Sequence, residues 1–374
     1  MVIAYTRCSS VYDDSRTTKE IGALLEDGHR IVLFGWDRDG KALQNCTELF
    51  SDYRDKIEFH FFYGKTGKGI IGKIVARLRW FDWLKRQLLC TKGVDFIHSC
   101  DFDTGSAVKA VARQQHIRYV YDIFDYYVDS HPVPRCLRTI IEREETAVIN
   151  LADATIICTE ERREQIANAK PKRLVIIHNS PDVEKAESKE LKYDYVYCGS
   201  MYGGRLISEI LEEYKKHREL RFVFAGYGEY AGKAKQLDGE EENFIYLGTI
   251  PYHEVLTTES QARIISAIYD SSKRNHRLCA PNKFYEALAL GKPVIVCRGT
   301  GIDQIVEDHR IGVVIDYNVN QFYQAVSDLA RNRDTCDEMG KRARKLYEDQ
   351  YRWSIMKDRL LDLYKDLQSQ QNEP

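Results

Sequence analysis

The chain has 374 residues, of which 43% are hydrophobic and 30% are charged, and its formal net charge is −2. This length favours two domains over one, and the composition supports a large buried core and excludes a mostly disordered chain. A nearly neutral charge gives no general attraction for nucleic acid, so we expect no nucleic-acid partner and look for anion binding in local patches.

The first half of the chain alternates short apolar runs with runs of helical period. Alternation of this kind predicts a parallel sheet with helices on both faces. We expect strands at 2–6, 30–36, 57–62, 95–99, 119–124, 154–159 and 174–178, and helices between them that include 17–28, 106–115, 137–152 and 160–169.

One segment of this half, residues 64–93, is strongly basic. It holds eight Lys or Arg residues against one Asp, interleaved with Trp80, Phe81 and Trp83, and apolar residues recur at helical spacing. A basic amphipathic helix of this kind is typical of contact with an anionic membrane surface. The alternative is a helix that faces the core and leaves its basic side in solvent.

The same alternating pattern restarts at residue 193. Strands are expected at 193–200, 221–228, 244–250, 263–270, 292–297 and 311–316, followed by an amphipathic helix at 353–368. We therefore predict a first Rossmann-like domain at 1–180, a linker at 181–192, a second such domain at 193–350, and a terminal segment at 351–374 that packs back on the first domain. Two doubly wound domains would leave a cleft that faces the carboxyl ends of both sheets.

Neither a targeting segment nor a disulfide framework is expected. Residues 1–10 lead directly into a strand, no apolar run approaches the ~20 residues that span a bilayer, and the ten cysteines include no C-x-x-C pair. We expect buried free thiols in a reducing compartment, and hence a cytoplasmic protein that is soluble or peripheral to the membrane.

The stretch APNKFYEALALGKPVIVC, residues 280–297, carries the clearest chemical pattern. A helix that begins near Asn282 directs free N–H groups and the positive end of its dipole at an anion, and Lys283 adds a full charge. Glu286 lies one turn inside, where it can accept hydrogen bonds from ribose hydroxyls. This spacing fits a nucleotide diphosphate, and the alternative is a surface ion pair between Lys283 and Glu286.

Residues 281–296 resemble the signature of the retaining nucleotide-sugar glycosyltransferases of family 4, the group 1 glycosyltransferases. Further stretches similar to this family are 13–36, 94–105, 120–130, 198–206, 223–230 and 351–364. The resemblance implies the GT-B fold, in which a first domain binds the acceptor and a second domain binds the nucleotide-sugar donor.

The resemblance also implies roles for residues of the second domain. Glu286 would bind the donor ribose, and Arg205 and Lys283 would stabilise the leaving diphosphate together with the amides near Asn282. The loops that contain Gly199, Gly204 and Gly226 would lie along the donor. Two positions depart from the family pattern: Leu278 stands where the first of two glutamates is expected, and Ser200 where an arginine is expected.

In the first domain, Ser15 and Arg16 open a helix that would face the donor, and Asp101 and Asp125 follow strands and would contact the sugar or the acceptor. Phe124 occupies the place of a histidine that many family members carry. The same residues are also ordinary helix caps and turn residues.

The implied reaction is retaining transfer of a sugar from a nucleotide diphosphate sugar to an acceptor hydroxyl, by front-side attack in which the leaving phosphate takes the proton. A saccharide is the expected acceptor, lipid-linked if residues 64–93 bind the cytoplasmic face of a membrane. We expect no cofactor and no metal, because the second domain has no D-x-D flanked by strands. The alternatives are a sugar-nucleotide 2-epimerase of the same fold and a non-catalytic sugar-nucleotide-binding subunit.

Overall fold

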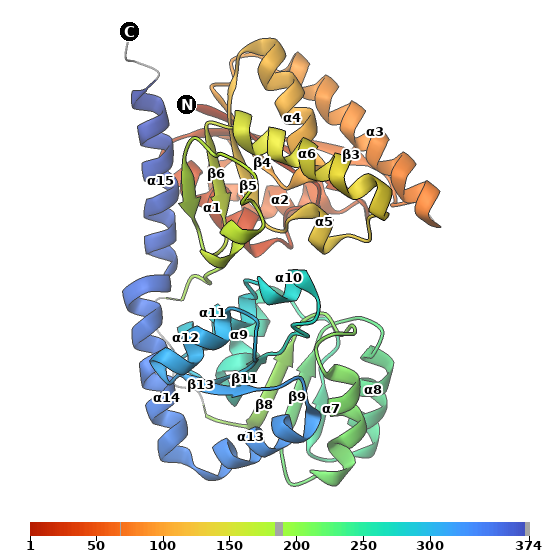
Figure 1. The fold of residues 1–374 in the computed structure, drawn as a ribbon, viewed down its shortest axis with the longest axis vertical. Helices are drawn as coiled ribbons and strands as arrows, with labels where there is room; N and C mark the ends of the chain where they lie inside the picture. The colour runs from red at the N-terminus through yellow and green to blue at the C-terminus, as the bar shows by residue number, and fades with distance from the viewer. Residues whose placement is uncertain (68, 184–189, 371–374) are drawn as a thin grey trace. The chain divides into compact units, whose positions relative to one another are not determined.

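The computed structural model describes residues 1–67, 69–183 and 190–370. The chain forms two compact units, the first made of Met1–His178 together with Lys357–Pro374 and the second of Asn179–Met356 (Figure 1). The predicted linker at 181–192 includes residues 184–189, which lie outside the described residues.

The first unit is built on a parallel sheet of seven strands in the order β3-β2-β1-β4-β5-β6-β7. These strands are β1 (Val2–Arg7), β2 (Arg30–Asp37), β3 (Ile57–Tyr63), β4 (Phe96–Cys100), β5 (Arg118–Ile123), β6 (Ala154–Ile157) and β7 (Leu174–Ile176). The main helices of this unit are α1 (Ser15–Glu26), α2 (Ala42–Leu49), α3 (Gly69–Cys90), α4 (Phe102–Gln115), α5 (Tyr127–Ser130) and α6 (Arg135–Leu151).

The two faces of this sheet bury different partners, because successive strand residues point to opposite sides. Ala4, Phe34 and Trp36 pack against residues of α3, α4 and α6 in one apolar cluster. Side chains on the opposite face of the sheet, such as His98, contact α15 (Trp353–Ser369). The Tyr364 hydroxyl of this helix lies 2.8 Å from His98 Nδ1. The last helix therefore completes the first unit.

The second unit is built on a parallel sheet of six strands in the order β10-β9-β8-β11-β12-β13. These strands are β8 (Tyr193–Cys198), β9 (Phe222–Ala225), β10 (Phe244–Tyr246), β11 (Ala262–Ala267), β12 (Val294–Cys297) and β13 (Gly312–Ile315). Its helices are α7 (Ile207–Glu213), α8 (Ala231–Glu240), α9 (Tyr252–Ser260), α10 (Arg274–Arg277), α11 (Asn282–Ala289), α12 (Ile302–His309), α13 (Val319–Arg331) and α14 (Arg333–Leu346).

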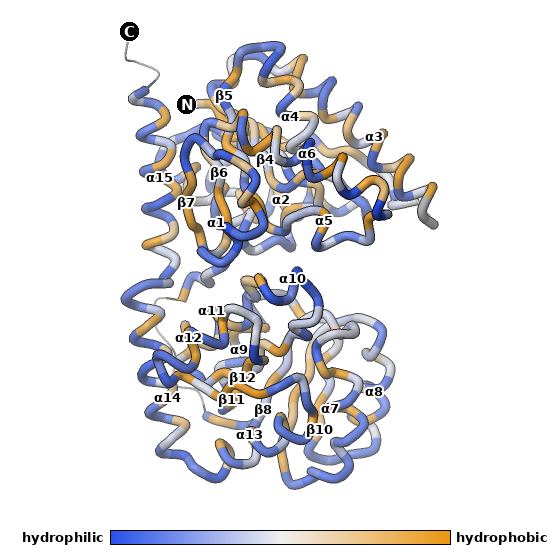
Figure 2. The backbone as a smooth tube through the Cα atoms, in the orientation of Figure 1, coloured by the Kyte–Doolittle hydropathy of each residue, from blue (hydrophilic) through white to orange (hydrophobic). Residues whose placement is uncertain are grey.

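The prediction of two doubly wound parallel sheets is confirmed, and each expected strand is present. In Figure 2 the hydrophobic colour concentrates along the strands at the centre of each unit, as expected for strands that are covered on both faces. The helix expected at 160–169 is wrong: only a short 3₁₀ turn forms, at Glu161–Glu164. Half of this run is charged, and it lacks the apolar stripe that a helix needs to pack.

Strand order fixes where a ligand can bind. In an open α/β sheet the strand order reverses at one point, and ligands bind outside the carboxyl ends of the two strands there. The reversal falls between β1 and β4 in the first unit and between β8 and β11 in the second.

Candidate functional site

Two glycine loops form the carboxyl edge of the second sheet. Gly199 follows β8 and Gly226 follows β9, and the Gly199 N–H donates to the Ala225 carbonyl at 2.8 Å. Both glycines have positive φ, +145° and +136°, and a Cβ on Gly226 would collide with the Gly199 carbonyl. Only glycine permits this close approach of two backbones, which leaves a strip of main chain without side chains beside the reversal point.

Lys283 extends across this strip from the second residue of α11. A Cβ placed on Gly199 would lie 2.6 Å from Lys283 Nζ, so the ammonium rests directly on the glycine loop. The same Nζ lies 4.8 Å from the centre of the Tyr197 ring. Burial alone would lower the pKa of Lys283, but its tyrosine and glutamate neighbours raise it, and the group stays charged. A fixed cation therefore lies at the start of a helix, where the helix dipole is also positive.

Glu286 follows Lys283 by one turn and is only 3% exposed. This burial excludes the surface ion pair that the sequence left open. A second acid that sequence reasoning missed, Glu259 at the end of α9, is fully buried nearby, and within the described part of the chain neither of its carboxylate oxygens has a hydrogen-bond partner. Burial raises the pKa of Glu259 well above its usual value, the charge of Glu286 raises it further, and Lys283 opposes both.

Arg205 lies in the loop between β8 and α7. Its guanidinium carbon is 5.3 Å from the centre of the Tyr269 ring, and among the described residues its buried Nε has no hydrogen-bond partner. Tyr269 follows β11, the second strand of the reversal point. An arginine held by stacking with a free N–H group is prepared to bind an anion.

Two further basic residues adjoin this arginine and were not found by sequence reasoning. A Cβ on Gly204, where φ is +87°, would lie 2.6 Å from Lys273 Nζ and 2.9 Å from His276 Cε1. Burial lowers the pKa of His276, as do the charges of Arg205 and Lys273. In the sequence these residues belong to the basic run Lys273–Arg277, which follows a strand. That run can be assigned to the site only when the strand order shows that β11 lies next to β8.

The remaining predicted positions of the second unit differ in exposure. Asn282 begins α11 and is exposed, as expected for a residue whose backbone would meet a ligand. Leu278 is 6% exposed and packs in the interior. The Ser200 carbonyl accepts a hydrogen bond from Tyr197 Oη at 2.7 Å, so this residue orders the loop through its backbone.

In the first unit, Arg16 belongs to a buried ion network. Its guanidinium donates to Glu20 at 2.9 Å and to Asp122 at 2.7 Å, and Tyr5 Oη donates to Glu20 at 2.7 Å. Arg16 also stacks on the Phe124 ring at 4.5 Å. These contacts favour the structural alternative for Arg16, while Ser15 is half-buried in the first turn of α1, where Asp14 provides the cap.

Asp101 and Asp125 lie at the carboxyl ends of β4 and β5 but differ in environment. One oxygen of Asp101 accepts from the N–H groups of Phe124 at 2.8 Å and Asp125 at 3.1 Å, and the other pairs with Arg7. Its backbone has φ 61° and ψ 168°, a conformation nearly restricted to glycine. Asp101 thus fixes the loop, whereas the Asp125 side chain is 52% exposed and pairs with Arg162 at 3.1 Å.

Three side chains of this network, His98, Cys100 and Asp122, bring possible metal-ligand atoms within 4.8 Å of one another. Asp122 is already paired with Arg16, and burial raises the pKa of the Cys100 thiol well above its usual value. A neutral thiol and a neutralised carboxylate fit a metal poorly. We assign the cluster to the core of the first unit.

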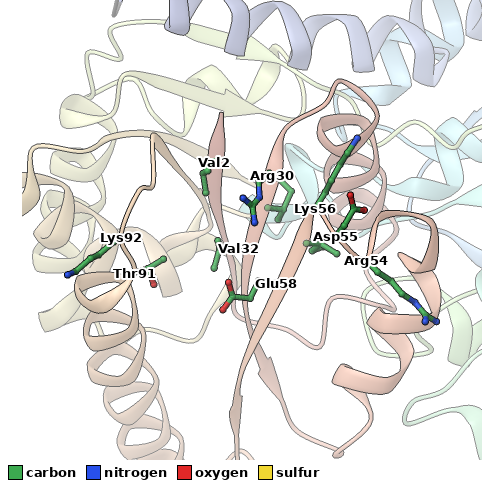
Figure 3. Close-up of a pocket in the computed structure, with 11 residues that line it drawn as sticks. Val2, Arg30, Val32, Arg54, Asp55, Lys56, Glu58, Thr91 and Lys92 are labelled. Atoms are coloured by element: carbon green, nitrogen blue, oxygen red, sulfur yellow. The ribbon is translucent and has the colours of Figure 1, made fainter.

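A separate hollow of ≈320 Å³ opens at the opposite edge of the first sheet (Figure 3). Its walls include Val2, Arg30 and Ile57, which are the first residues of β1, β2 and β3. Because ligands of open α/β sheets bind outside the carboxyl ends, this amino-terminal hollow is not part of the candidate site.

Known proteins resemble the second unit in sequence. Residues 193–332 match the family model described as Glycosyl transferases group 1. Spore coat protein SA of Bacillus subtilis (strain 168) is 29% identical over 82 residues, which are 21% of this chain and 22% of that protein. The GDP-mannose-dependent alpha-(1-6)-phosphatidylinositol monomannoside mannosyltransferase of Mycobacterium tuberculosis (strain CDC 1551 / Oshkosh) is 34% identical over 80 residues, 21% of each chain. The similarity thus spans about a fifth of these curated relatives.

Solved structures match over nearly the whole chain. Sucrose-phosphate synthase from Thermosynechococcus elongatus has a TM-score of 0.71 at 14% identity, covering 99% of both chains. Anabaena HepE in complex with UDP has a TM-score of 0.67 at 12% identity, covering 98% of this chain and 100% of that one. The predicted GT-B fold class is confirmed. The chain therefore has the GT-B fold throughout, and its residues 193–332 carry the sequence pattern of the group 1 glycosyl transferases.

Proposed function

We propose that this protein transfers a sugar from a nucleotide diphosphate sugar to an acceptor hydroxyl. The observation that carries the proposal is the position of Lys283, whose ammonium rests on Gly199 at the point where the strand order of the second sheet reverses. The group 1 glycosyl transferase model covers this loop and α11 together. A solved structure of similar fold, that of Anabaena HepE, contains UDP, and this supports the same donor class.

The charges of the site suit a diphosphate leaving group. Negative charge grows on the diphosphate as the bond to the sugar breaks, and cations that are already in place stabilise that charge without reorganising. Lys283 and Arg205 provide two such cations, and the first amides of α11 provide donors. This set supplies positive charge from the protein itself, and we therefore propose that the reaction needs no metal.

Glu286 is proposed to bind the ribose. Its carboxylate is buried one turn after Lys283 on α11, so it is screened from bulk water, and its two oxygens can accept hydrogen bonds from two vicinal hydroxyls. A buried carboxylate forms charge-assisted hydrogen bonds that are stronger than those made at the surface.

We further propose retention of configuration at the anomeric carbon, as the family that residues 281–296 resemble implies, and neither of the two acids described beside Lys283 is exposed to act as a nucleophile. Glu259 and Glu286 are both buried. In front-side attack the acceptor oxygen bonds to the anomeric carbon as the bond to the diphosphate breaks, and the acceptor proton passes to the diphosphate.

A saccharide is the proposed acceptor, and a lipid-linked one is favoured by the curated relative named as a phosphatidylinositol monomannoside mannosyltransferase. Asp125 is the predicted acceptor-side residue with an exposed carboxylate at a strand end.

Nucleotide binding tests the proposal directly. Titration calorimetry with UDP, GDP, dTDP and ADP would identify the base, and Lys283→Met should weaken the best ligand by about 10- to 100-fold, since a hydrogen bond to a charged group contributes about 1.5–3 kcal/mol. Lys341→Met is the matched control, because Lys341 is 72% exposed on α14 of the same unit. Unchanged affinity in Lys283→Met would contradict the proposed site.

The reaction is tested with the corresponding sugar nucleotides and no acceptor. Slow release of free sugar by the wild type, lost in Glu286→Gln, is the result expected of a transferase. An isomerised donor would instead identify a 2-epimerase, and tight donor binding without turnover, with and without saccharide acceptors, would identify a binding subunit.

A further inference from the structure

Helix α3 carries an apolar stripe that its own unit leaves uncovered. Ile71, Ile74, Val75 and Leu78 are 79%, 51%, 41% and 62% exposed. Their spacing of three, four and seven residues places them on one face of the helix. Four neighbouring large aliphatic side chains in solvent form a patch rather than the scattered exposed residues that are normal on a surface.

The opposite face of α3 makes the helix's contact with the core. Ala76, Trp80, Leu84 and Leu88 are at most 9% exposed and belong to the apolar cluster under α3, α4 and α6. Leu78 follows Ala76 by two residues, which is about 200° around the helix. The outer stripe therefore contributes nothing to the core, and in Figure 2 hydrophobic and hydrophilic colours alternate along the whole helix.

The aromatic residues of this helix lie on the core side, which corrects the expectation that they contact an interface. Trp80 is 1% exposed, its ring centre is 5.8 Å from that of Trp36, and its Nε1 donates to the Asp103 carbonyl at 2.9 Å. Trp83 packs on Trp80 at 5.4 Å. Any surface contact of α3 must therefore depend on its aliphatic stripe.

Positive charge surrounds the outer stripe. Lys73 and Arg79 are exposed next to Ile74 and Leu78. The segment 64–93 has eight Lys or Arg residues against one acid, Asp82, and that acid is paired with Arg86 at 2.7 Å. The patch thus combines aliphatic side chains with basic side chains that no neighbouring acid of the segment neutralises.

We propose that the outer stripe of α3 docks on an anionic lipid surface, with Ile71, Ile74, Val75 and Leu78 among the acyl chains and Lys73 and Arg79 at the headgroups. Among the described residues, no helix is both long and apolar enough to cross a bilayer. A helix with an apolar stripe and basic flanks instead lies in the plane of the membrane. A second copy of the chain is a poorer occupant, because it would bring two basic strips together.

This surface agrees with a lipid-linked acceptor but does not rest on the proposed reaction, because it is argued from α3 alone. Binding to vesicles and binding to nucleotides are measured separately, so that failure of one leaves the other intact.

The test is cosedimentation of the full chain with phosphatidylglycerol vesicles and with phosphatidylcholine vesicles. The wild type should bind the anionic vesicles preferentially, and binding should weaken as salt rises from about 0.1 to 1 M, where the Debye length falls from about 10 to 3 Å. Ile71→Glu/Ile74→Glu/Leu78→Glu should lose about tenfold or more in binding. Lys73→Glu/Arg79→Glu should lose about 25-fold, at about fivefold for each basic residue.

Leu43→Glu/Leu49→Glu is the matched control, because these two leucines of α2 are 46% and 51% exposed in the same unit. It should bind like the wild type. All variants change exposed residues, and circular dichroism would verify that they fold. Equal binding by the α3 triple variant, or equal binding of the wild type to both vesicle types, would overturn the proposal. Self-association without vesicles that the triple variant abolishes would identify a second copy as the occupant and would also overturn it.

Discussion

Glu259 of the second unit lies in an environment that is poorly suited to its charge. Its side chain is fully buried at the end of α9, and among the described residues neither oxygen has a hydrogen-bond partner. Transfer of an unpaired carboxylate from water into a protein interior is costly, so the protonated form is favoured. The neighbouring acid Glu286 adds to this effect. The burial of Glu259 beside the proposed ribose-binding residue therefore lowers the stability of the second unit.

The raised pKa of Glu259 predicts that the stability of the protein depends on pH. A carboxyl whose pKa is raised on folding binds its proton more tightly in the folded state, so stability falls as pH rises above the unfolded pKa of about 4.3. The fall is about 1.4 kcal/mol for each pH unit until the folded pKa is reached. Glu259→Gln removes this dependence, and its stability relative to the wild type should increase with pH across that window.

Calorimetric melting of both proteins between about pH 5 and pH 8 would measure this difference. Glu254→Gln is the control, because the Glu254 side chain lies on the same helix and is 54% exposed. Parallel pH profiles for all three proteins would show that Glu259 does not titrate abnormally.

At the scale of elements, the positions of the strands were readily predicted from the sequence, but the face of each helix that packs on the core was not. Strands such as β9 and β12 are covered on both sides, so their sequences are continuous apolar runs. Helix α3 has apolar residues all round, and nothing in its sequence distinguishes the stripe of Trp80 from the stripe of Leu78. Which of the two stripes faces the core depends on the strands that α3 covers. The approach of Lys273 to Gly204 likewise depends on how the strands are ordered in the sheet. The proximity of Glu286 to Lys283 was predictable, because the two residues are one turn apart on one short helix.

The two stripes of α3 predict opposite results from similar truncations. Trp80→Ala removes a side chain that is 1% exposed and should destabilise the first unit by about 3–5 kcal/mol. Leu78→Ala removes one that is 62% exposed and should change stability by no more than about 0.5 kcal/mol. Urea unfolding followed by tryptophan emission and by circular dichroism would compare them, since Trp36, Trp80 and Trp83 all belong to this unit. A large loss in Leu78→Ala would show that the outer stripe is covered, which would also weaken the proposed membrane contact.

At the scale of the whole molecule, the chain leaves the first unit after His178 and returns to it at Lys357. The returning segment is part of the core of that unit. Leu360, Leu363, Tyr364 and Leu367 are at most 1% exposed, and Arg118 donates to the Leu367 carbonyl at 2.6 Å. The first unit is therefore incomplete until the last residues of α15 are present.

A chain that ends after Met356 tests this dependence. Burial of each large apolar side chain contributes about 1.5–3 kcal/mol. The loss of these four side chains therefore removes a free energy comparable to the whole stability of a typical domain. Limited proteolysis should then digest residues 1–178 rapidly and spare a fragment from about residue 179 onward, because the second unit keeps its own core. A chain that ends at Ser369 retains all of α15 and should resist digestion as the wild type does.

Tyr364→Phe tests the same dependence with a smaller change to α15. It removes only the hydroxyl that lies 2.8 Å from His98 Nδ1, and the unpaired imidazole should cost the first unit about 1–3 kcal/mol. Digestion of residues 1–178 should therefore be faster than in the wild type and slower than in the chain that ends after Met356. Equal protease resistance of all these chains would show that the first unit folds without its last helix. The order wild type, Tyr364→Phe, truncated chain would instead show that this unit completes its fold only when the end of the chain has been added.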